Sequence, residues 1–231
     1  MDDTTKKLLL IGASRGLGLA VAAEYLKRGW SVVATELSHS PALHELCEAS
    51  GGRLEVERVD VTSSHQISAL RSRLGGRRFD LLFHNAGVTN PEKETIADVS
   101  TFEFERVMVT NTLSPLRVLE TLQDIVVKSG TLGVMSSGQG SVSNNEKGGW
   151  EVYRASKAAL NSLMRSFRAR RMDDPRNMLL MAPGWVRTEM GGPNAKLSID
   201  ESIPKLVAVM EGQAGKGGLH YLDYQGNVVP W

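Results

Sequence analysis

Tyr153 and Lys157 lie four positions apart in the segment "YRASK", and their types and spacing can support proton transfer. Side chains at positions i and i+4 of a helix are neighbours, with Cβ atoms about 5 to 6 Å apart. A phenol has an ordinary pKa of about 10, and an adjacent ammonium lowers that pKa because it stabilises the phenolate. Such a pair can deliver a proton to a carbonyl oxygen or remove one from an alcohol.

The strength of this effect depends on how much water surrounds the pair. An ammonium about 4 to 5 Å from the phenolate contributes about 4 kcal/mol at an effective dielectric near 20, but about 1 kcal/mol in bulk water. The larger value corresponds to a shift of about three pKa units. The pair therefore needs a dry pocket, because on an exposed helix the same spacing describes two amphipathic side chains with polar tips.

A glycine-rich turn follows the first apolar run, with Gly12, Gly16 and Gly18 in "LLLIGASRGLGLAVAAEYL". The first glycine permits a tight turn, the second lets the backbone approach a pyrophosphate, and the third allows close helix packing. The helix that follows offers free N–H groups to an anion. The turn could also join a strand to a helix with no ligand, but its place after the first strand of an alternating chain favours a dinucleotide.

Glu36 and Arg15 bear on which dinucleotide would bind. Glu36 lies 20 residues beyond Gly16, at the end of the second apolar run. A carboxylate there accepts hydrogen bonds from the adenosine ribose of NAD and repels the 2′-phosphate of NADP, whereas Arg15 could pair with that phosphate. Because one exposed arginine offsets a carboxylate poorly, the sequence favours NAD(H). Either residue could also be a solvated side chain with no ligand.

Short apolar runs alternate with longer amphipathic stretches. The runs, most of them apolar on both faces, predict buried strands at residues 6–12, 30–36, 53–61, 79–87, 130–137, 177–184 and 219–224. Helical patterns occupy residues 17–29, 40–50, 63–75, 98–128 with a break, 151–171 and 199–212. Since a parallel return needs a crossover, we predict an α/β fold: a Rossmann-like, doubly wound sheet of about seven mostly parallel strands with helices on both faces.

The length of 231 residues suits a single domain over residues 1–231 and is short for a separate substrate domain. Two segments rich in Gly, Asn and Ser, 137–149 and 183–196, follow strands and are expected to be mobile. They should lie at the carboxyl edge of the sheet, where open α/β sheets bind ligands.

The composition disfavours several classes of partner. The chain has 27 basic and 26 acidic residues and a net charge of +1, which indicates no surface for nucleic acid or an anionic membrane. Cys47 is the only cysteine, so the chain has no intrachain disulfide, as expected in a reducing compartment. The N-terminus lacks the layout of a signal peptide, and no apolar run approaches the roughly 20 residues that span a bilayer. We therefore expect a cytoplasmic protein.

Seven motifs occur in order along the chain: "GASRGLG" at 12–18, "DVT" at 60–62, "HNAG" at 84–87, "NTLSP" at 111–115, "SS" at 136–137, "YRASK" at 153–157 and "PGWVRT" at 183–188. Together they closely resemble those of the short-chain dehydrogenase/reductase family. The C-terminal part looks most like the carbonyl reductases of the sniffer and C-factor type. The resemblance implies an oxidoreductase that transfers a hydride between a nicotinamide cofactor, NAD(P)(H), and a carbonyl compound or secondary alcohol.

The resemblance also implies a role for each matching residue. Asn111, Ser137, Tyr153 and Lys157 would form the catalytic tetrad, with Tyr153 as the general acid and base. Ser137 would hydrogen-bond the substrate oxygen, and Asn111 would hold a water near Lys157. Thr188 and the backbone around Val186 would hold the nicotinamide carboxamide. The cofactor-binding set would be Gly12, Ser14, Arg15, Gly16, Leu17, Gly18, Glu36, Asp60, Val61, Asn85, Ala86, Gly87, Tyr153, Lys157, Pro183, Gly184, Val186 and Thr188.

Bound cofactor is expected to take part in activating Tyr153, since it excludes water and its oxidised ring is positively charged. Three positions depart from the family pattern. Ile11 replaces the usual threonine before the first glycine, and His84 replaces the first asparagine of the "NNAG" motif. Glu36 replaces a basic residue common in this branch. The first two bear on local packing and the third on cofactor choice.

The hydroxyl of the tetrad has two rivals to Ser137. Ser137 lies 16 residues before Tyr153, a few more than is usual in the family, with the surplus in the loop between them. Ser136 should point to the opposite face of its strand, because side chains alternate, and Ser141 is an outside alternative. His84 is expected to be a hydrogen-bonded core histidine, and no metal site is expected.

The short segment after residue 183 predicts an open pocket roofed by Trp185, Met190 and Trp150, suited to a small apolar carbonyl compound or secondary alcohol. The run 98–128 has more apolar positions than one core-facing stripe needs. Either it is buried on two sides with a kink at Pro115, or it pairs with its copy in a homodimer.

Two other functions would share this architecture. A non-catalytic redox sensor would bind the dinucleotide but has no need of a paired tyrosine and lysine. A methyltransferase would also place an acid after the second strand, but it has no use for "YRASK".

Overall fold

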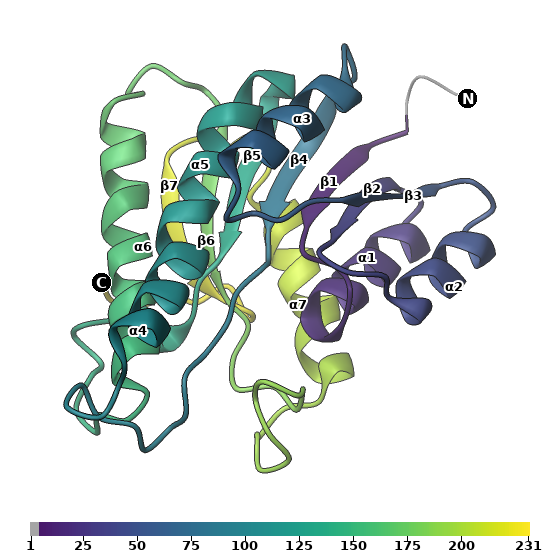
Figure 1. The fold of residues 1–231 in the computed structure, drawn as a ribbon. Coiled ribbons are helices and arrows are strands. Elements are labelled where there is room, and N and C mark those ends of the chain that lie inside the picture. The colour runs from purple at the N-terminus through teal and green to yellow at the C-terminus, as the bar shows by residue number, and fades with distance from the viewer. Residues whose placement is uncertain (1–4) are drawn as a thin grey trace.

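The computed structural model describes residues 5–231, which form one seven-stranded parallel sheet with helices on both faces (Figure 1). The spatial order of the strands is β3-β2-β1-β4-β5-β6-β7. The predicted fold class is confirmed, and each predicted strand is present with its ends shifted by a few residues. The strands are β1 (Lys7–Ile11), β2 (Ser31–Glu36), β3 (Leu54–Arg58), β4 (Phe79–His84), β5 (Val126–Met135), β6 (Asn177–Ala182) and β7 (Leu219–Asp223).

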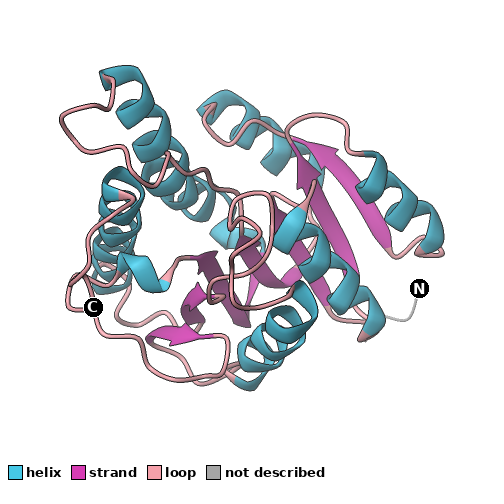
Figure 2. Ribbon diagram, turned by 90° about the horizontal axis from the view of Figure 1, so that it is seen from below, coloured by secondary structure: helices cyan, strands magenta, loops and turns pink. Residues whose placement is uncertain are grey.

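The helices divide between the two faces of the sheet (Figure 2). They are α1 (Gly16–Lys27), α2 (Pro41–Ala49), α3 (Ser64–Leu74), α4 (Thr101–Met108), α5 (Ser114–Leu122), α6 (Glu151–Ala169) and α7 (Ile199–Gly212). Apolar side chains of α3, α5 and α6 pack with Leu9 and Ile11 of β1, whereas those of α1 and α7 pack with Leu8 and Leu10. This division follows from the alternation of side chains along a strand.

The predicted helical run 98–128 is divided differently from the prediction. A π-helical turn, Val109–Leu113, joins α4 to α5, and Pro115 lies in the first turn of α5 instead of kinking a longer helix. A 3-10 turn follows α5, and β5 begins at Val126 instead of residue 130. Since π turns insert an extra residue and often occur at functional sites, the presence of Asn111 in this turn is informative.

The carboxyl edge of the sheet lies along the bottom of Figure 1. The strand order reverses there between β1 and β4, which is where open α/β sheets bind ligands. The loops after these two strands are joined, since the backbone N–H groups of Asn85 and Ala86 both donate to the carbonyl of Ile11, at 2.8 and 3.0 Å. The edge therefore gathers loops from distant parts of the chain. Within residues 5–231, no helix is both long and apolar enough to cross a bilayer.

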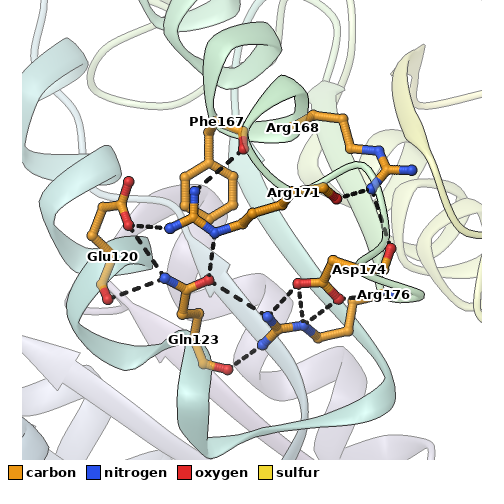
Figure 3. A network of polar contacts seen from close by, with 7 residues as sticks. All are labelled: Glu120, Gln123, Phe167, Arg168, Arg171, Asp174 and Arg176. Atoms are coloured by element: carbon orange, nitrogen blue, oxygen red, sulfur yellow. Dashed lines mark hydrogen bonds and ion pairs between the residues drawn. The ribbon is translucent and has the colours of Figure 1, made fainter.

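A network of charged side chains joins the end of α6 to α5 (Figure 3). Arg176 pairs with Asp174, and their side chains are only 5% and 7% exposed. Arg171 pairs with Glu120 and donates to Oε1 of Gln123 at 2.9 Å. A surface cavity of about 590 Å³ lies beside this network. Because these charges are paired with one another, we interpret the network as structural.

Candidate active site

The glycine turn is closed tightly against the loop after β4. Gly12 has a φ of +86°, and a Cβ at this position would lie 2.6 Å from that of Ala86. A Cβ at Gly18 would lie 2.0 Å from the carbonyl oxygen of Gly12. Asn85 donates from Nδ2 to the same oxygen at 2.7 Å. Both glycines are therefore required by close backbone approach, as the sequence predicts.

Ile11, one of the departures from the family pattern, is fully buried. The hydroxyl oxygen of Thr35 on β2 accepts a hydrogen bond from the backbone N–H of Gly12 at 2.9 Å. Thr35 on β2 thus holds the glycine turn in place. The local packing is complete although Ile11 replaces the threonine that is usual in the family.

The N-terminus of α1 fits an anionic group. Among residues 5–231, no side chain caps its first turn, which begins at Arg15 and includes Gly16 and Leu17. Gly16 has a φ of +54°, and the space above it is open up to the methyl group of Thr188, which would lie 3.7 Å from a Cβ at Gly16. Uncapped N–H groups at the start of a helix bind phosphate, so this turn can hold a dinucleotide pyrophosphate beside Thr188.

The segment from residue 183 to 197 faces the glycine turn and is held by its own hydrogen bonds. The hydroxyl of Ser202 donates to the carbonyl of Pro183 at 2.7 Å, and Gly184 has a φ of +82°. Thr188 accepts from the N–H of Gly191 at 3.0 Å, and Val186 bridges to Leu197. Arg15 forms an exposed ion pair with Glu189. These contacts bring the 183–188 motif to the side of the glycine turn.

Glu36 at the end of β2 is buried, and both of its oxygens have partners. Oε2 accepts from the N–H of Ser40 at 2.8 Å, and Oε1 lies 3.1 Å from Nε2 of His44. The hydroxyl of Ser40 donates to the carbonyl of Ser14 in the glycine turn. The Glu36 carboxylate therefore lies next to that turn but is turned inward.

Asp60 and Val61 lie in the loop after β3. The Asp60 carboxylate accepts from the backbone N–H and the hydroxyl of Thr62, at 2.8 and 2.7 Å. Val61 is 9% exposed. Asp60 thus has a structural role, because it shapes the loop that leads into α3. Contact with an adenine ring would be a second role.

Tyr153 and Lys157 meet on α6, as the spacing predicts. The Lys157 Nζ lies 5.7 Å from the centroid of the Tyr153 ring and donates to the carbonyl of Met135 at 2.9 Å. Lys157 is 4% exposed. A Cβ at Gly87 would lie 3.6 Å from this nitrogen and 3.3 Å from Oδ1 of Asn111. The ammonium therefore lies between the ends of β4 and β5, close to the π turn.

The pKa values of this pair differ in part from the sequence-based expectation. Burial raises the pKa of Tyr153 above its ordinary value, and the nearby Ser137 hydroxyl opposes this shift. Burial also lowers the pKa of Lys157 to about 8. The phenol was expected to be acidified by the ammonium, but in this structure desolvation has the larger effect. Tyr153 is therefore a protonated acid near neutral pH, ready to donate.

Asn111 is fully buried and belongs to the same cluster. Its Oδ1 accepts from the N–H of Val88 at 2.8 Å, and its Nδ2 donates to the carbonyl of Val88 at 2.8 Å. The same Nδ2 donates to the hydroxyl oxygen of Ser156 at 3.0 Å, and Ser156 donates to the carbonyl of Tyr153 at 2.7 Å. Asn111 therefore ties the loop after β4 to the helix that carries the acid.

The two serines at the end of β5 point in different directions. Ser136 is buried and donates to Oδ1 of Asn161 at 2.7 Å, whereas Ser137 lies beside the Tyr153 phenol. Ser141 accepts from the N–H of Asn144 at 3.2 Å within its own loop. The alternation along the strand thus places the Ser137 hydroxyl at the phenol.

A pocket of about 500 Å³ is lined by Asn90, Trp150, Trp185 and Met190, among others. The backbone of Trp150 has a φ of +47°, which is rare for a bulky residue. Trp185 donates from Nε1 to the carbonyl of Gly191 at 2.8 Å, which fixes its ring. The three large side chains that were expected to roof the pocket therefore do line one cavity.

His84 differs from the expectation of the sequence analysis, and a group of possible metal ligands lies elsewhere in the chain. His84 is buried, but its Nε2 has no hydrogen-bond partner among the described residues, so it is not the satisfied core histidine that was expected. Burial and the nearby Lys157 charge lower its pKa to about 3, and it is therefore neutral. The side chains of Glu36, His39 and His44 gather with their ligand atoms within 4.8 Å of one another, a cluster that the sequence analysis missed.

Two positioning residues also escaped the sequence analysis. Asn90 is 2% exposed, and its Oδ1 accepts from the backbone N–H of Tyr153 at 3.1 Å. The Tyr221 hydroxyl on β7 donates to the carbonyl of Ser137. The contact from Tyr221 spans 84 residues of sequence, so no local pattern could reveal it.

The family model for short chain dehydrogenases matches residues 6–197. A short-chain dehydrogenase/reductase from Burkholderia multivorans, solved with bound NADP, is 56% identical, covers 98% of this chain and 100% of its own, and superposes with a TM-score of 0.96. A carbonyl reductase from Pseudomonas aeruginosa in complex with NADP is 37% identical, with 99% and 100% coverage and a TM-score of 0.92. C-signal from Myxococcus xanthus is 35% identical over 66% of this chain and 92% of its own.

The chain belongs to the short-chain dehydrogenase/reductase family and is an oxidoreductase. The predicted resemblance to the sniffer and C-factor type is confirmed by the matches to C-signal and to carbonyl reductases.

Proposed function

We propose that the protein transfers a hydride between a nicotinamide cofactor and a carbonyl compound or secondary alcohol, with Tyr153 as general acid and base. The main support for this proposal is the proximity of Lys157 to Tyr153, with Nζ 5.7 Å from the centroid of the tyrosine ring. Both residues lie at the carboxyl edge of the sheet, as the glycine turn does. The cofactor would supply the hydride. The residues proposed to hold it are those of the glycine turn, the loop after β4 and the 183–188 segment.

The proton chemistry follows from the positions of three side chains. In the reducing direction the protonated Tyr153 phenol donates to the substrate oxygen, and the Ser137 hydroxyl hydrogen-bonds that oxygen as charge develops. The Lys157 ammonium stabilises the phenolate that remains. Burial lowers the pKa of Lys157 to about 8, so the side chain is still mostly charged at neutral pH.

The choice between the two cofactors rests on Glu36. The sequence favoured NAD(H) because a carboxylate repels the 2′-phosphate. Both oxygens of this carboxylate already have partners in the structure, from Ser40 and His44, so that repulsion is weaker than a free carboxylate would give. Two relatives were solved with NADP. We therefore propose that NADP(H) is used at least as well as NAD(H), with Arg15 free to leave its exposed ion pair.

The pocket between Trp150, Trp185 and Met190 suits an apolar, partly aromatic carbonyl compound of small size. Its volume of about 500 Å³ lies in the range of ordinary small-molecule sites. A carbonyl reductase among the relatives supports this substrate class. A panel of ketones, aldehydes and quinones with NADH and NADPH in parallel tests the proposal, and failure of every compound with both cofactors would contradict it.

A non-catalytic redox sensor is the less favoured reading, because a sensor needs neither the buried ammonium nor the phenol beside it. The methyltransferase reading is excluded by membership of the oxidoreductase family.

A homodimer through the 98–128 region remains part of the proposal. Phe102 on α4 is 75% exposed, and Leu113 on the π turn is 38% exposed. Exposed apolar side chains of this size support pairing with a second copy. Sedimentation of the protein and of a Phe102→Glu variant tests it, since the variant should sediment as a smaller species. A cytoplasmic location also stays a prediction.

A further inference from the structure

We propose that Glu36, His39 and His44 form a binding site for a first-row transition metal ion such as Zn²⁺, at the edge of the glycine turn. Each side chain offers one ligand atom, and the three atoms lie within 4.8 Å of one another. The histidines come from the loop between β2 and α2 and from α2, and Glu36 ends β2. The site therefore stands on two regular elements and the short loop that joins them.

The ligand set indicates which ions would bind. Two imidazole nitrogens and one carboxylate oxygen suit Zn²⁺ and its neighbours, and three protein ligands leave one position open to water or another ligand. Mg²⁺ and Ca²⁺ prefer oxygen ligands throughout, so they are disfavoured. Cys47 is not part of the set, because its thiol donates to the carbonyl of Leu54.

The spacing is close to what a tetrahedral ion requires. Zinc bonds of about 2.0 to 2.1 Å place neighbouring ligand atoms about 3.3 Å apart. Oε1 of Glu36 and Nε2 of His44 lie 3.1 Å apart. His39 is exposed, and its ring centroid lies 4.3 Å from that of His44, so rotation of this one side chain can bring its nitrogen to the ion.

The carboxylate is already held in an orientation that suits a metal ligand. Oε2 of Glu36 accepts from the backbone N–H of Ser40 at 2.8 Å, which leaves Oε1 directed at His44. The Glu36 side chain is 7% exposed, so it cannot swing into solvent without breaking this bond. Such support of a ligand by a backbone donor is typical of metal sites and strengthens binding. A metal ion would replace the direct contact between His44 and Glu36.

The position of the site gives it a consequence for the cofactor. The hydroxyl of Ser40 donates to the carbonyl of Ser14, so the cluster touches the glycine turn. In the proposed function the Glu36 carboxylate accepts hydrogen bonds from the adenosine ribose of NAD(H), and an ion that takes its Oε1 withdraws that oxygen from the ribose. Metal and NAD(H) should therefore weaken each other's binding by the same factor. The metal site stands by itself, whereas this antagonism rests on the proposed function.

The test uses the full chain, free of added metal. Co²⁺ is titrated first, because bound Co²⁺ absorbs in the visible range, and Zn²⁺ affinity is then measured by competition with a chromophoric chelator. We expect one ion per chain, and at least about a tenfold loss of affinity in His39→Ala and in His44→Ala. His65→Ala, which removes an exposed histidine from α3, is the matched control and should bind as the unaltered protein does.

NADH affinity is then measured with and without saturating Zn²⁺. We expect weaker NADH binding with Zn²⁺ in the unaltered protein and no change in His39→Ala. Metal binding no tighter in the unaltered protein than in a protein carrying both His39→Ala and His44→Ala, or an equal loss in His65→Ala, would overturn the metal site. A protein that binds Zn²⁺ as expected but never binds NADH or NADPH would instead contradict the proposed function. Metal bound with no effect on NADH would overturn only the antagonism.

Discussion

Replacing Lys157 by methionine removes the ammonium beside Tyr153 and keeps most of the side-chain volume. The Nζ lies 5.7 Å from the ring centroid. At an effective dielectric near 20, a unit charge at this distance stabilises the phenolate by about 3 kcal/mol, whereas in bulk water the value is about 0.7 kcal/mol. These energies correspond to increases in the phenol pKa of about two units and about half a unit. The increase in the Tyr153 pKa in this variant therefore reports the effective dielectric of the site.

The assay is the pH dependence of kcat/KM for oxidation of a secondary alcohol, which needs the phenolate. We expect the limb of the profile assigned to Tyr153 to move up by about two units in Lys157→Met, so that oxidation at pH 7 falls about a hundredfold. Carbonyl reduction at pH 7 should fall by a similar factor, because it leaves the phenolate that the ammonium stabilises. Since Lys157 also donates to Met135, cofactor affinity is measured separately for each variant.

Lys157→Arg is the control, because it keeps a charge at the same place. Its profile should lie near that of the unaltered enzyme. A displacement of half a unit or less in Lys157→Met, with the cofactor still bound, would refute the reasoning. It would mean that the ammonium acts through water or only as a structural donor.

Two further predictions concern stability. Trp150 has a φ of +47°, so the Trp150→Gly variant should be more stable than the Trp150→Ala variant by about 1 kcal/mol, the reverse of the order of glycine and alanine inside a helix. Urea unfolding measures the two free energies of unfolding. A more stable alanine variant would argue against backbone strain at this position. Asp174→Asn should lower the free energy of unfolding by about 3 kcal/mol at pH 7, because it leaves buried Arg176 unpaired. Arg176 holds the pKa of Asp174 below its ordinary value. The stabilisation is therefore complete above the unfolded-state pKa of about 3.9 and lost as pH falls through the lower folded value. The free energies of unfolding of the unaltered protein and of Asp174→Asn should differ at pH 7 and become similar at pH 2.5. An equal difference at both pH values would contradict the ion pair as the source of this stabilisation.

The sequence predicted the sheet and most helices because the strands are buried on both faces and the helices are amphipathic. The prediction was wrong where a segment can adopt either of two local conformations. Residues 126–128 fit a helical pattern but pair with β4 through Val126, since the sheet contributes hydrogen bonds that a fraying helix end lacks. The π turn that carries Asn111 was invisible because it needs only one extra residue within an otherwise helical run.

The candidate site was predictable in its parts but not in its electrostatics. Spacing placed Tyr153 and Lys157 on one helical face, and alternation separated Ser136 from Ser137. The direction of the Tyr153 pKa shift was not predictable, because it depends on how deeply the phenol is buried by distant segments. The cluster around Glu36 was missed for a similar reason, since His39 and His44 become neighbours only through the turn between β2 and α2.

The most direct test of the central claim is Tyr153→Phe, which removes only the phenolic oxygen. NADPH binding, measured by calorimetry, should stay within about twofold of the unaltered protein, and turnover of the best carbonyl substrate should fall by about 10²- to 10⁴-fold. If the variant binds NADPH and keeps more than about a tenth of the turnover, general acid catalysis by this phenol is contradicted.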